Sequence, residues 1–345
     1  MNLGVIPDRP LEVLKAIVHD YIASKEPVGS KSLVERHSFG VSAATIRNDM
    51  AILEEEELIV APHTSSGRVP TDKGYRMFVD RLGEVKPLSP AEKSAIEDFL
   101  SKSSDLDETL SHTARLLSQL TNQVALVQYP SLGKASVRHI ELIRIDEKRI
   151  LLMLITNSGR IQQHVFEVPG SYESGDLEKL RNLLNESLEG RPLGEVASLV
   201  KAASSKSVGK VKQLAERVVP ELLRLVDANS QEKIVLAGTS NLARREDDFP
   251  GSISPVLEAI EEQVVLLKLI SEMQADQHGV SLRIGRENTV DALSSTSVVL
   301  SGYENQGSEI AKVGVIGPTR MDYSSNIGAV RAVARYLTKS LGGHQ

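Results

Sequence analysis

The chain has 345 residues, of which 41% are hydrophobic and only 3% aromatic, and its formal net charge at pH 7 is −6. This length exceeds one ordinary domain, so we expect roughly two or three domains with aliphatic cores. The absence of cysteine excludes disulfides, thiolate catalysis and cysteine-ligated metal sites.

Targeting and membrane segments are not expected either. The first residues lack the basic and then apolar character of a signal peptide. The longest uncharged apolar run, Ile150 to Ile155, is far shorter than the roughly 20 residues that span a bilayer. We therefore expect a cytoplasmic protein with no membrane partner.

The N-terminal residues predict two helices. Pro10 is expected to open the first, because proline fits the first helical turn. The apolar stripe of this helix consists of Leu11, Leu14, Ile17, Val18, Tyr21 and Ile22. Ser30 is the expected N-cap of a second, short helix with Leu33 and Val34 inward. That helix should end before Gly40, which can take the positive φ of a tight turn.

A third helix should follow, with Ser42 as its N-cap. Its inward residues fall at helical spacing and are Ala43, Ile46, Met50 and Leu53. The opposite side carries Ala44, Thr45, Asn48 and Ala51, with Arg47 on the flank. Small residues let a helix backbone approach a groove floor, and Arg and Asn match guanine and adenine edges in the major groove. This pattern is typical of a recognition helix.

A hairpin is predicted after this helix. Leu58 to Pro62 indicates a strand, His63 to Arg68 a loop, and Val69 a return strand. Arg68 is expected near the tip, where it could enter a minor groove or bind phosphate. Thr71 should then cap another helix, whose apolar side consists of Tyr75, Phe78, Val79 and Leu82.

This order of elements is typical of a winged helix-turn-helix that reads duplex DNA, and the alternative is a generic two-helix unit with a surface hairpin. The candidate DNA-binding residues are Lys31, Ser42, Ala44, Thr45, Arg47, Asn48, Arg68, Lys73 and Arg76. Residues 1–85 contain 10 Lys plus Arg against 13 Asp plus Glu, a formal charge of −3, although DNA binders usually show a basic surface. We therefore expect few phosphate contacts per monomer and a need for a dimer.

The rest of the chain alternates between strand-rich and helical stretches. After a proline-rich linker from Glu84 to Pro90, a helical region is expected to about Asn122. Strands are predicted at Val124 to Gln128, His139 to Ile145, Arg149 to Thr156, Arg160 to Val168, Lys233 to Ala237, Val280 to Ile284, Thr296 to Tyr303 and Lys312 to Ile316. Helices are predicted at Asp176 to Asp227, Val256 to Gln274 and Ser325 to Leu341. A strand-rich part that is interrupted and then resumed indicates an inserted domain.

Three runs resemble the HrcA family of bacterial heat-inducible transcription repressors. They are Ser42 to Glu54 (SAATIRNDMAILE), Ser66 to Arg76 (SGRVPTDKGYR) and Val313 to Tyr323 (VGVIGPTRMDY). The resemblance implies an α+β multidomain fold with an N-terminal winged helix-turn-helix, a GAF-like α/β domain and an inserted, mainly helical dimerisation domain. We place these domains at 1–84, at 89–170 plus 275–345, and at 171–274.

The resemblance also implies the activity and its control. A homodimer would bind an inverted-repeat operator of double-stranded DNA and repress chaperone operons of the grpE-dnaK-dnaJ and groELS type. A GroEL-type chaperonin would keep the repressor active, and heat would relieve repression by diverting the chaperonin to unfolded proteins.

Candidate chemistry elsewhere is sparse. His139, His164 and His278 are scattered without ligand spacing, so no metal site, cofactor or enzymatic activity is expected. The glycine-rich turn from Gly314 to Arg320 could bind an anion, but we favour a structural connection in which Arg320 forms an internal pair. The remaining charged group, which we expect to be a salt-linked surface cluster, is Arg283, Arg286 and Glu287.

Two other functions remain open at this point. A regulator could bind a small effector in its GAF-like domain and change its dimer geometry. More remotely, the helix-turn-helix could be a protein-interaction module of an enzyme, although no catalytic motif is present.

Overall fold

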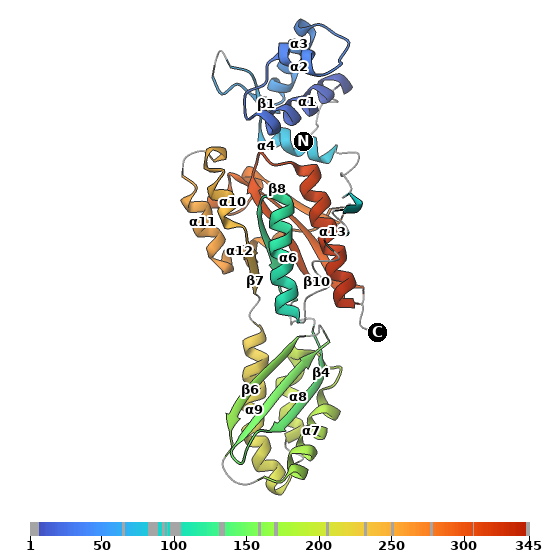
Figure 1. Cartoon of the computed structure of the whole chain (residues 1–345), viewed down its shortest axis with the longest axis vertical. Coiled ribbons are helices and arrows are strands. Elements are labelled where there is room, and N and C mark those ends of the chain that lie inside the picture. The colour runs from blue at the N-terminus through green and yellow to red at the C-terminus, as the bar shows by residue number, and fades with distance from the viewer. Residues whose placement is uncertain are drawn as a thin grey trace.

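The computed structural model describes residues 7–63, 66–81, 89–91, 94, 96, 105–130, 135–157, 160–168, 172–204, 207–230, 233–249, 252–276, 279–305 and 307–342. They form a mixed α+β structure of three units stacked along the long axis (Figure 1). We call them the N-terminal unit (7–81), the central unit (105–130 and 233–342) and the inserted unit (135–230).

The N-terminal unit is a winged helix. Its elements are α1 (Asp8–Ser24), α2 (Ser30–Arg36), α3 (Ala43–Glu55), β1 (Ile59–Val60), β2 (Val69–Pro70) and α4 (Asp72–Asp80). The two short strands pair antiparallel. Leu14, Ile17, Leu33, Ile46 and Leu53 are fully buried and form the core that the helical spacing predicted.

The predicted helix ends are mostly confirmed. The hydroxyls of Ser42 and Thr71 accept hydrogen bonds from the amides of Thr45 and Gly74, so both N-caps are correct. Gly40 has a φ of +67° in the turn between α2 and α3. Ser30, however, is not a cap. It is the buried first residue of α2 and Gly29 occupies the N-cap position, so the sequence prediction was one residue late. Leu82 and most of the expected linker lie outside the described residues.

The central unit is built on an antiparallel sheet with the strand order β7-β3-β10-β9-β8. The strands are β3 (Val124–Gln128), β7 (Ile234–Ala237), β8 (Val280–Ile284), β9 (Thr296–Asn305) and β10 (Ser308–Pro318). The long helices α6 (Leu106–Thr121) and α13 (Tyr323–Gly342) cover one face. The shorter α10 (Thr239–Ala243), α11 (Ser254–Glu261) and α12 (Gln263–Glu272) cover the other (Figure 1). Alternate residues of β3, β7, β9 and β10 therefore enter two different cores.

The inserted unit has its own sheet and core. Strands β4 (Val137–Arg144), β5 (Arg149–Thr156) and β6 (Ile161–Glu167) form an antiparallel sheet. Helices α7 (Ser174–Leu188) and α9 (Gly209–Ser230) pack on one face of it, and α8 (Val196–Ser204) packs against these two helices. The buried cluster of this unit is separate from those of the central unit.

This pairing corrects the predicted domain boundaries of 89–170 plus 275–345 and 171–274. The strands β4 to β6 pair with one another and not with β3, and α11 and α12 pack on the central sheet. The chain thus leaves the central sheet after β3 and returns at β7, and the inserted unit is a sheet covered by helices. Periodicity in the sequence predicts that a strand exists, but not which distant strand it pairs with. For example, β3 pairs with β7 and β10, which both lie more than 100 residues further along the chain.

Candidate nucleic-acid interface

Helix α3 presents a polar and small-residue face to solvent. Ile46, Met50 and Leu53 are buried, and they fix which side of the helix points inward. The outer residues expected from the sequence, Ala44, Arg47, Asn48 and Ala51, are exposed. Because α3 is seated on α1 and α2, this face can enter a groove as a rigid body.

Asp49 anchors α3 from its inner side. Its side chain is 3% exposed and accepts hydrogen bonds from Arg9 Nε at 2.7 Å and Arg9 Nη2 at 3.1 Å. This forked pairing links the start of α1 to the middle of α3. No local pattern predicts this pair, because the two residues are distant in the chain.

Thr45 occupies a different position from its exposed neighbours. It is half-buried, and its hydroxyl lies 3.1 Å from the Ser42 hydroxyl, which also accepts the Thr45 amide at 3.2 Å. Ser42 and Thr45 therefore complete the helix start, and Ser42 is itself exposed. Base contact from Thr45 would come from the edge of the α3 face.

Arg68 does not stand near the tip of the wing. Its backbone forms a bridge with Val28, with both N–O distances at 2.9 Å. Its Nε donates to Glu54 Oε2 at 2.9 Å, and its Nη1 donates to the Ser66 carbonyl at 3.2 Å. The expectation that Arg68 lies near the tip was wrong, because pairing with the extended segment before α2 places this residue at the base of the hairpin.

A hollow of about 390 Å³ lies where α2, α3 and the base of the wing meet. It brings together three of the predicted basic residues, Lys31, Arg47 and Arg68, together with Glu54. Lys31 and Arg47 are exposed. The unit has negative formal charge, yet this hollow has one acid against three bases.

Lys73 and Arg76 do not line this hollow. Lys73 Nζ donates to the Glu56 carbonyl at 2.7 Å. Arg76 contacts the central unit, where its Nε donates to Glu287 Oε1 at 2.8 Å and its Nη2 donates to the Leu282 carbonyl at 2.9 Å. The structure therefore gives Arg76 a partner that competes with phosphate, and Glu287 is too remote in sequence for pattern reading to have found it.

The turn before α13 is structural, as favoured from the sequence. Arg320 Nη2 donates to Asp248 Oδ1 at 2.7 Å, and Arg320 Nη1 donates to the Ile22 carbonyl at 2.7 Å. The expected cluster near β8 is also salt-linked, since Arg283 lies 3.4 Å from Glu272. It is not only a surface cluster, because Glu287 reaches the N-terminal unit.

The histidines have ordinary acidic neighbours. His139 Nε2 is 3.2 Å from Glu141 Oε2, and His164 Nε2 is 3.2 Å from Glu221 Oε2, while His278 lies outside the described residues. Within the described ranges, no group of three or more His, Asp or Glu side chains could hold a metal ion. In the same residues, no helix combines the length and the apolar character needed to cross a membrane.

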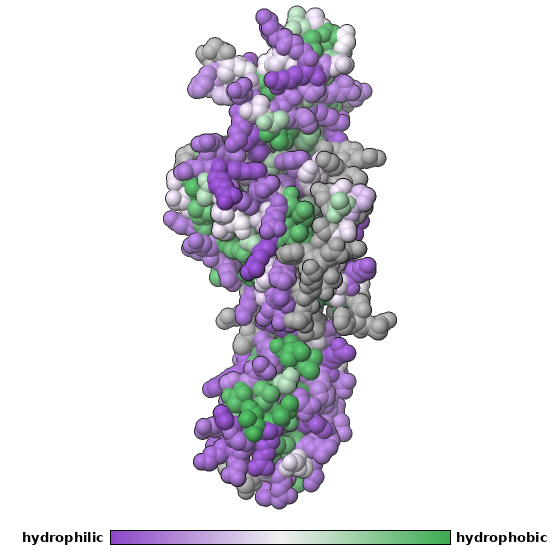
Figure 2. All heavy atoms as spheres, viewed as in Figure 1, coloured by the Kyte–Doolittle hydropathy of each residue, from purple (hydrophilic) through white to green (hydrophobic). Residues whose placement is uncertain are grey.

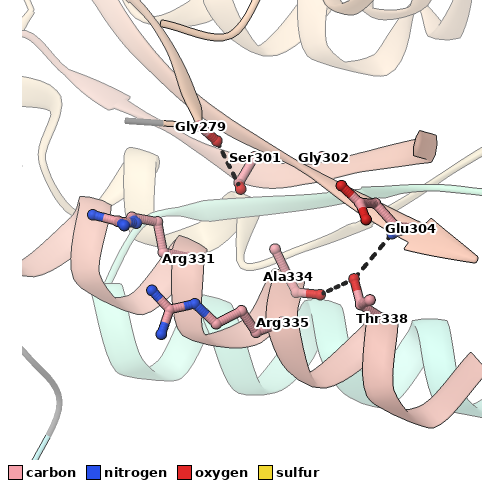
Figure 3. A pocket seen from close by; sticks show the side chains of 8 residues that line it. All are labelled: Gly279, Ser301, Gly302, Glu304, Arg331, Ala334, Arg335 and Thr338. Carbon is pink, nitrogen blue, oxygen red and sulfur yellow. Dashed lines mark hydrogen bonds between the residues drawn. The ribbon is translucent and has the colours of Figure 1, made fainter. Parts of the chain in front are cut away.

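A second hollow, of about 290 Å³, lies between β9 and α13 in the central unit (Figure 3). Arg331 and Arg335 extend into it from the same side of α13, one turn apart. Glu304 and Thr338 lie toward the other end, where the Glu304 amide donates to the Thr338 hydroxyl at 2.9 Å. No acid in the described residues is bonded to either arginine, and nothing in the sequence singled out this pair.

A helix-turn-helix with a short β-hairpin, joined to a sheet-based unit with an insertion, is typical of a multidomain DNA-binding regulator. Residues 107–327 match the model of the HrcA protein C-terminal domain. The chain belongs to the HrcA family, which is a family of transcription repressors and not an enzyme class.

The relatives match over nearly their whole length. The heat-inducible transcription repressor HrcA of Clavibacter michiganensis subsp. michiganensis is 58% identical over 337 residues, 98% of this chain and 99% of the relative. The repressor of the same name from Leifsonia xyli subsp. xyli is 56% identical over 338 residues, 98% of this chain and 100% of the relative. A solved structure described as a hypothetical protein at 2.2 Å resolution is 26% identical, with a TM-score of 0.68 over 99% of this chain and 100% of that one.

Proposed function

We propose that a homodimer of this chain represses chaperone operons by occupying an inverted-repeat operator. The observation that carries the proposal is the exposed face of α3, with Arg47 and Asn48 between Ala44 and Ala51. Arg and Asn can each make paired hydrogen bonds to base edges, and alanines let the helix backbone come close. Bound DNA would then be unavailable to the transcription machinery.

The negative formal charge of the N-terminal unit favours base reading by two copies over electrostatic adhesion by one. Each phosphate that a protein neutralises adds about 0.9 to the salt slope of log K, so a unit with few free basic residues gains little from phosphate alone. Two α3 helices related by a two-fold axis would bind two half-sites together. Such a dimer requires an operator with dyad symmetry.

The surface we propose for dimerisation is the outer face of the β4-β5-β6 sheet, the face without helices. Strand register places Ile143, Leu151 and Val165 in one row across it and Ile155 beside Ile161 in another. Ile143, Ile161 and Val165 are 44%, 59% and 45% exposed. Figure 2 shows apolar residues gathered over this sheet in the lowest unit. Exposed apolar patches of this kind mark interfaces, and a self-complementary strand face fits a second copy.

The proposed signal that ends repression is heat, and this part of the proposal follows from family membership. The relatives are named heat-inducible repressors, and we propose that this chain also loses repression on heating. In our proposal a GroEL-type chaperonin maintains the DNA-binding form, and heat lowers the amount of chaperonin that is free to do so.

Selection of bound duplexes from a random pool tests the proposal. The expected product is an inverted repeat with one fixed spacer, protected at both half-sites in a footprint. Recovery of sequences without dyad symmetry, or of no enriched sequence, would overturn the operator model.

The hollow with Arg331 and Arg335 favours a second candidate function, regulation by a small anion. Two guanidinium groups one helical turn apart are suited to a carboxylate or phosphate. Calorimetry with inorganic phosphate and with succinate, on the full chain and on a variant with Arg331→Gln and Arg335→Gln, tests this. Binding that the double variant loses, together with a change in operator affinity, would support it. Identical heats for both proteins would exclude it.

A further inference from the structure

The N-terminal unit is bound to the central unit through polar contacts on two sides of an aromatic centre. We call these contacts the junction. We propose that Asp248, Arg320, Arg76 and Glu287 are positioning residues, which fix the direction of α3 relative to the dimer and thereby set the spacing between half-sites that the protein accepts. The inference rests on the proposed operator binding. It adds that these four residues determine which spacing between half-sites the protein accepts.

Asp248 and Arg320 form the first side of the junction. Their side chains are 3% and 10% exposed. While Arg320 Nη2 donates to Asp248, its Nη1 donates to the carbonyls of Ile22 at 2.7 Å and Tyr21 at 3.3 Å. These carbonyls belong to the last turn of α1, where a cation is favoured because the helix C-terminus carries partial negative charge. One guanidinium thus joins the helix end to a buried carboxylate of the central unit.

Lys25 adds a second cation to the same acid. Its Nζ lies 3.1 Å from Asp248 Oδ1, and Lys25 is the residue that ends α1 in a left-handed conformation, with φ of 61°. Asp248 therefore receives two positive groups, one from each unit. The other oxygen of this carboxylate, Oδ2, is buried and has no hydrogen-bond partner among the described residues.

Arg76 and Glu287 form the other side. Arg76 from α4 donates through Nε and Nη2 to the two carboxylate oxygens of Glu287, and through Nη2 to the Leu282 carbonyl. Glu287 is held in turn, since its carboxylate accepts the Ile284 amide at 2.8 Å. A paired arginine–carboxylate contact restricts direction as well as distance.

Close backbone approach reinforces this second side. The Arg286 amide donates to Asp72 Oδ2 at 2.9 Å. The neighbouring Gly285 has φ of +55°, and a Cβ there would lie 2.1 Å from the Asp72 carboxylate. A residue without a side chain is therefore required for the first turn of α4 to lie against the end of β8.

Tyr75 and Tyr323 lie between the two polar sides. Their ring centroids are 5.7 Å apart, and both side chains are buried. The Tyr323 hydroxyl donates to the Thr319 carbonyl at 2.6 Å, whereas that of Tyr75 has no partner in the described part of the chain. Because the contacts lie on two separated sides of a packed centre, the N-terminal unit cannot rotate freely relative to the central unit.

A fixed direction has a direct consequence for operator choice. Half-sites on one face of the duplex recur about every 10 to 10.5 base pairs, so inserting about 5 base pairs turns one half-site to the opposite face. Two rigidly held α3 helices cannot follow that rotation. Two loosely tethered α3 helices can follow the rotation, because binding of the second half-site then depends mainly on the effective concentration of the second helix near it.

The test compares variants of the full chain on three duplexes, namely the selected operator, the same operator with about 5 extra base pairs in the spacer, and a single half-site. Asp248→Asn keeps shape but removes charge, and Arg76→Met keeps the aliphatic stem. The matched control is Arg283→Gln, since the Arg283–Glu272 pair at 3.4 Å lies within the central unit. For the unaltered chain we expect the operator to bind at least about tenfold more tightly than the lengthened one.

Each junction variant should reduce this ratio several-fold and leave half-site affinity within about twofold, while the control keeps both values. Equal losses on all three duplexes would indicate a merely structural role and overturn the inference. An unchanged ratio would overturn it as well.

A measurement without DNA separates this inference from the operator proposal. The chain has no cysteine, so spin labels can be placed through Lys15→Cys on α1 and Lys339→Cys on α13, both at exposed positions. We expect one narrow distance distribution that broadens with Asp248→Asn and with Arg76→Met, but not with Arg283→Gln. Equally narrow distributions in all proteins would exclude the junction as a positioning device, even if the operator proposal holds.

Discussion

The guanidinium of Arg68 and the carboxylate of Glu54 are joined by a hydrogen bond of 2.9 Å, which connects the hairpin to α3. The Arg68 side chain is 27% exposed, so it is held but not buried. In the free protein this arginine is therefore directed along α3 by an acid of the same unit. DNA phosphate would have to compete with that acid for it.

Removing the acid should release Arg68 for phosphate. We expect Glu54→Gln to steepen the dependence of log K on log salt by about 0.9, which corresponds to one additional neutralised phosphate. Titrations at several salt concentrations measure this slope. Glu55→Gln makes the same charge change one residue further on, where no bond to Arg68 exists, and serves as the control. Equal slopes for both variants would show that Arg68 is not released.

The exposed face of α3 should determine base selectivity. Arg47→Ala or Asn48→Ala is expected to cost roughly 1 to 3 kcal/mol on the operator and to reduce discrimination at the contacted position. Competition binding against single-base variants of the operator measures both quantities. Arg115→Ala removes an exposed arginine from α6 and should change neither. Unaltered affinity and selectivity in Arg47→Ala would mean that another face enters the groove.

The buried Asp49 should contribute to stability as well as to the seating of α3. Asp49→Ala removes the acceptor of two hydrogen bonds from a charged partner, and we expect a loss of about 1.5 to 3 kcal/mol in the free energy of unfolding. Urea denaturation followed by circular dichroism measures the loss. Glu12→Ala, an exposed acid on α1, is the matched control. A loss no larger than that of the control would contradict the anchoring role.

A charge on the outer face of the β4-β5-β6 sheet should prevent dimerisation. Val165→Lys places an ammonium group in the row formed with Ile143 and Leu151, where burial of a charge without a partner is costly. Sedimentation equilibrium should show a monomer with poor operator binding. Gln213→Lys adds the same charge at an exposed position of α9 and should remain dimeric. A dimeric Val165→Lys variant would place the interface elsewhere.

The winged helix was predictable because its signals are local. The N-cap at Ser42, the inward series from Ile46 to Leu53 and the turn at Gly40 each depend on neighbours within a few residues. The motif resemblance covered both ends of the chain, and it agrees with the family to which the chain belongs.

The errors concern residues whose partners are distant in sequence. In the sequence nothing marks Glu287 as a partner of Arg76, but the fold places Glu287 beside it. The fold likewise places Val28 and Glu54 beside Arg68. The inserted unit was divided wrongly for the same reason, because three strands with ordinary β patterns pair only with one another. Which strands pair depends on how long loops close, and local sequence patterns do not predict this.

The buried clusters of the molecule have a consequence for melting. The core of the N-terminal unit continues into the core beneath α6 and α13, from Leu14 through Tyr75 to Tyr323 and Val330, whereas the inserted unit has a cluster of its own. Parts that share a core unfold together, and parts with separate cores can open independently. We therefore expect calorimetry to resolve two transitions, with α3 lost in the same step as the central sheet. In such a protein, warming that loosens the sheet would also abolish operator recognition.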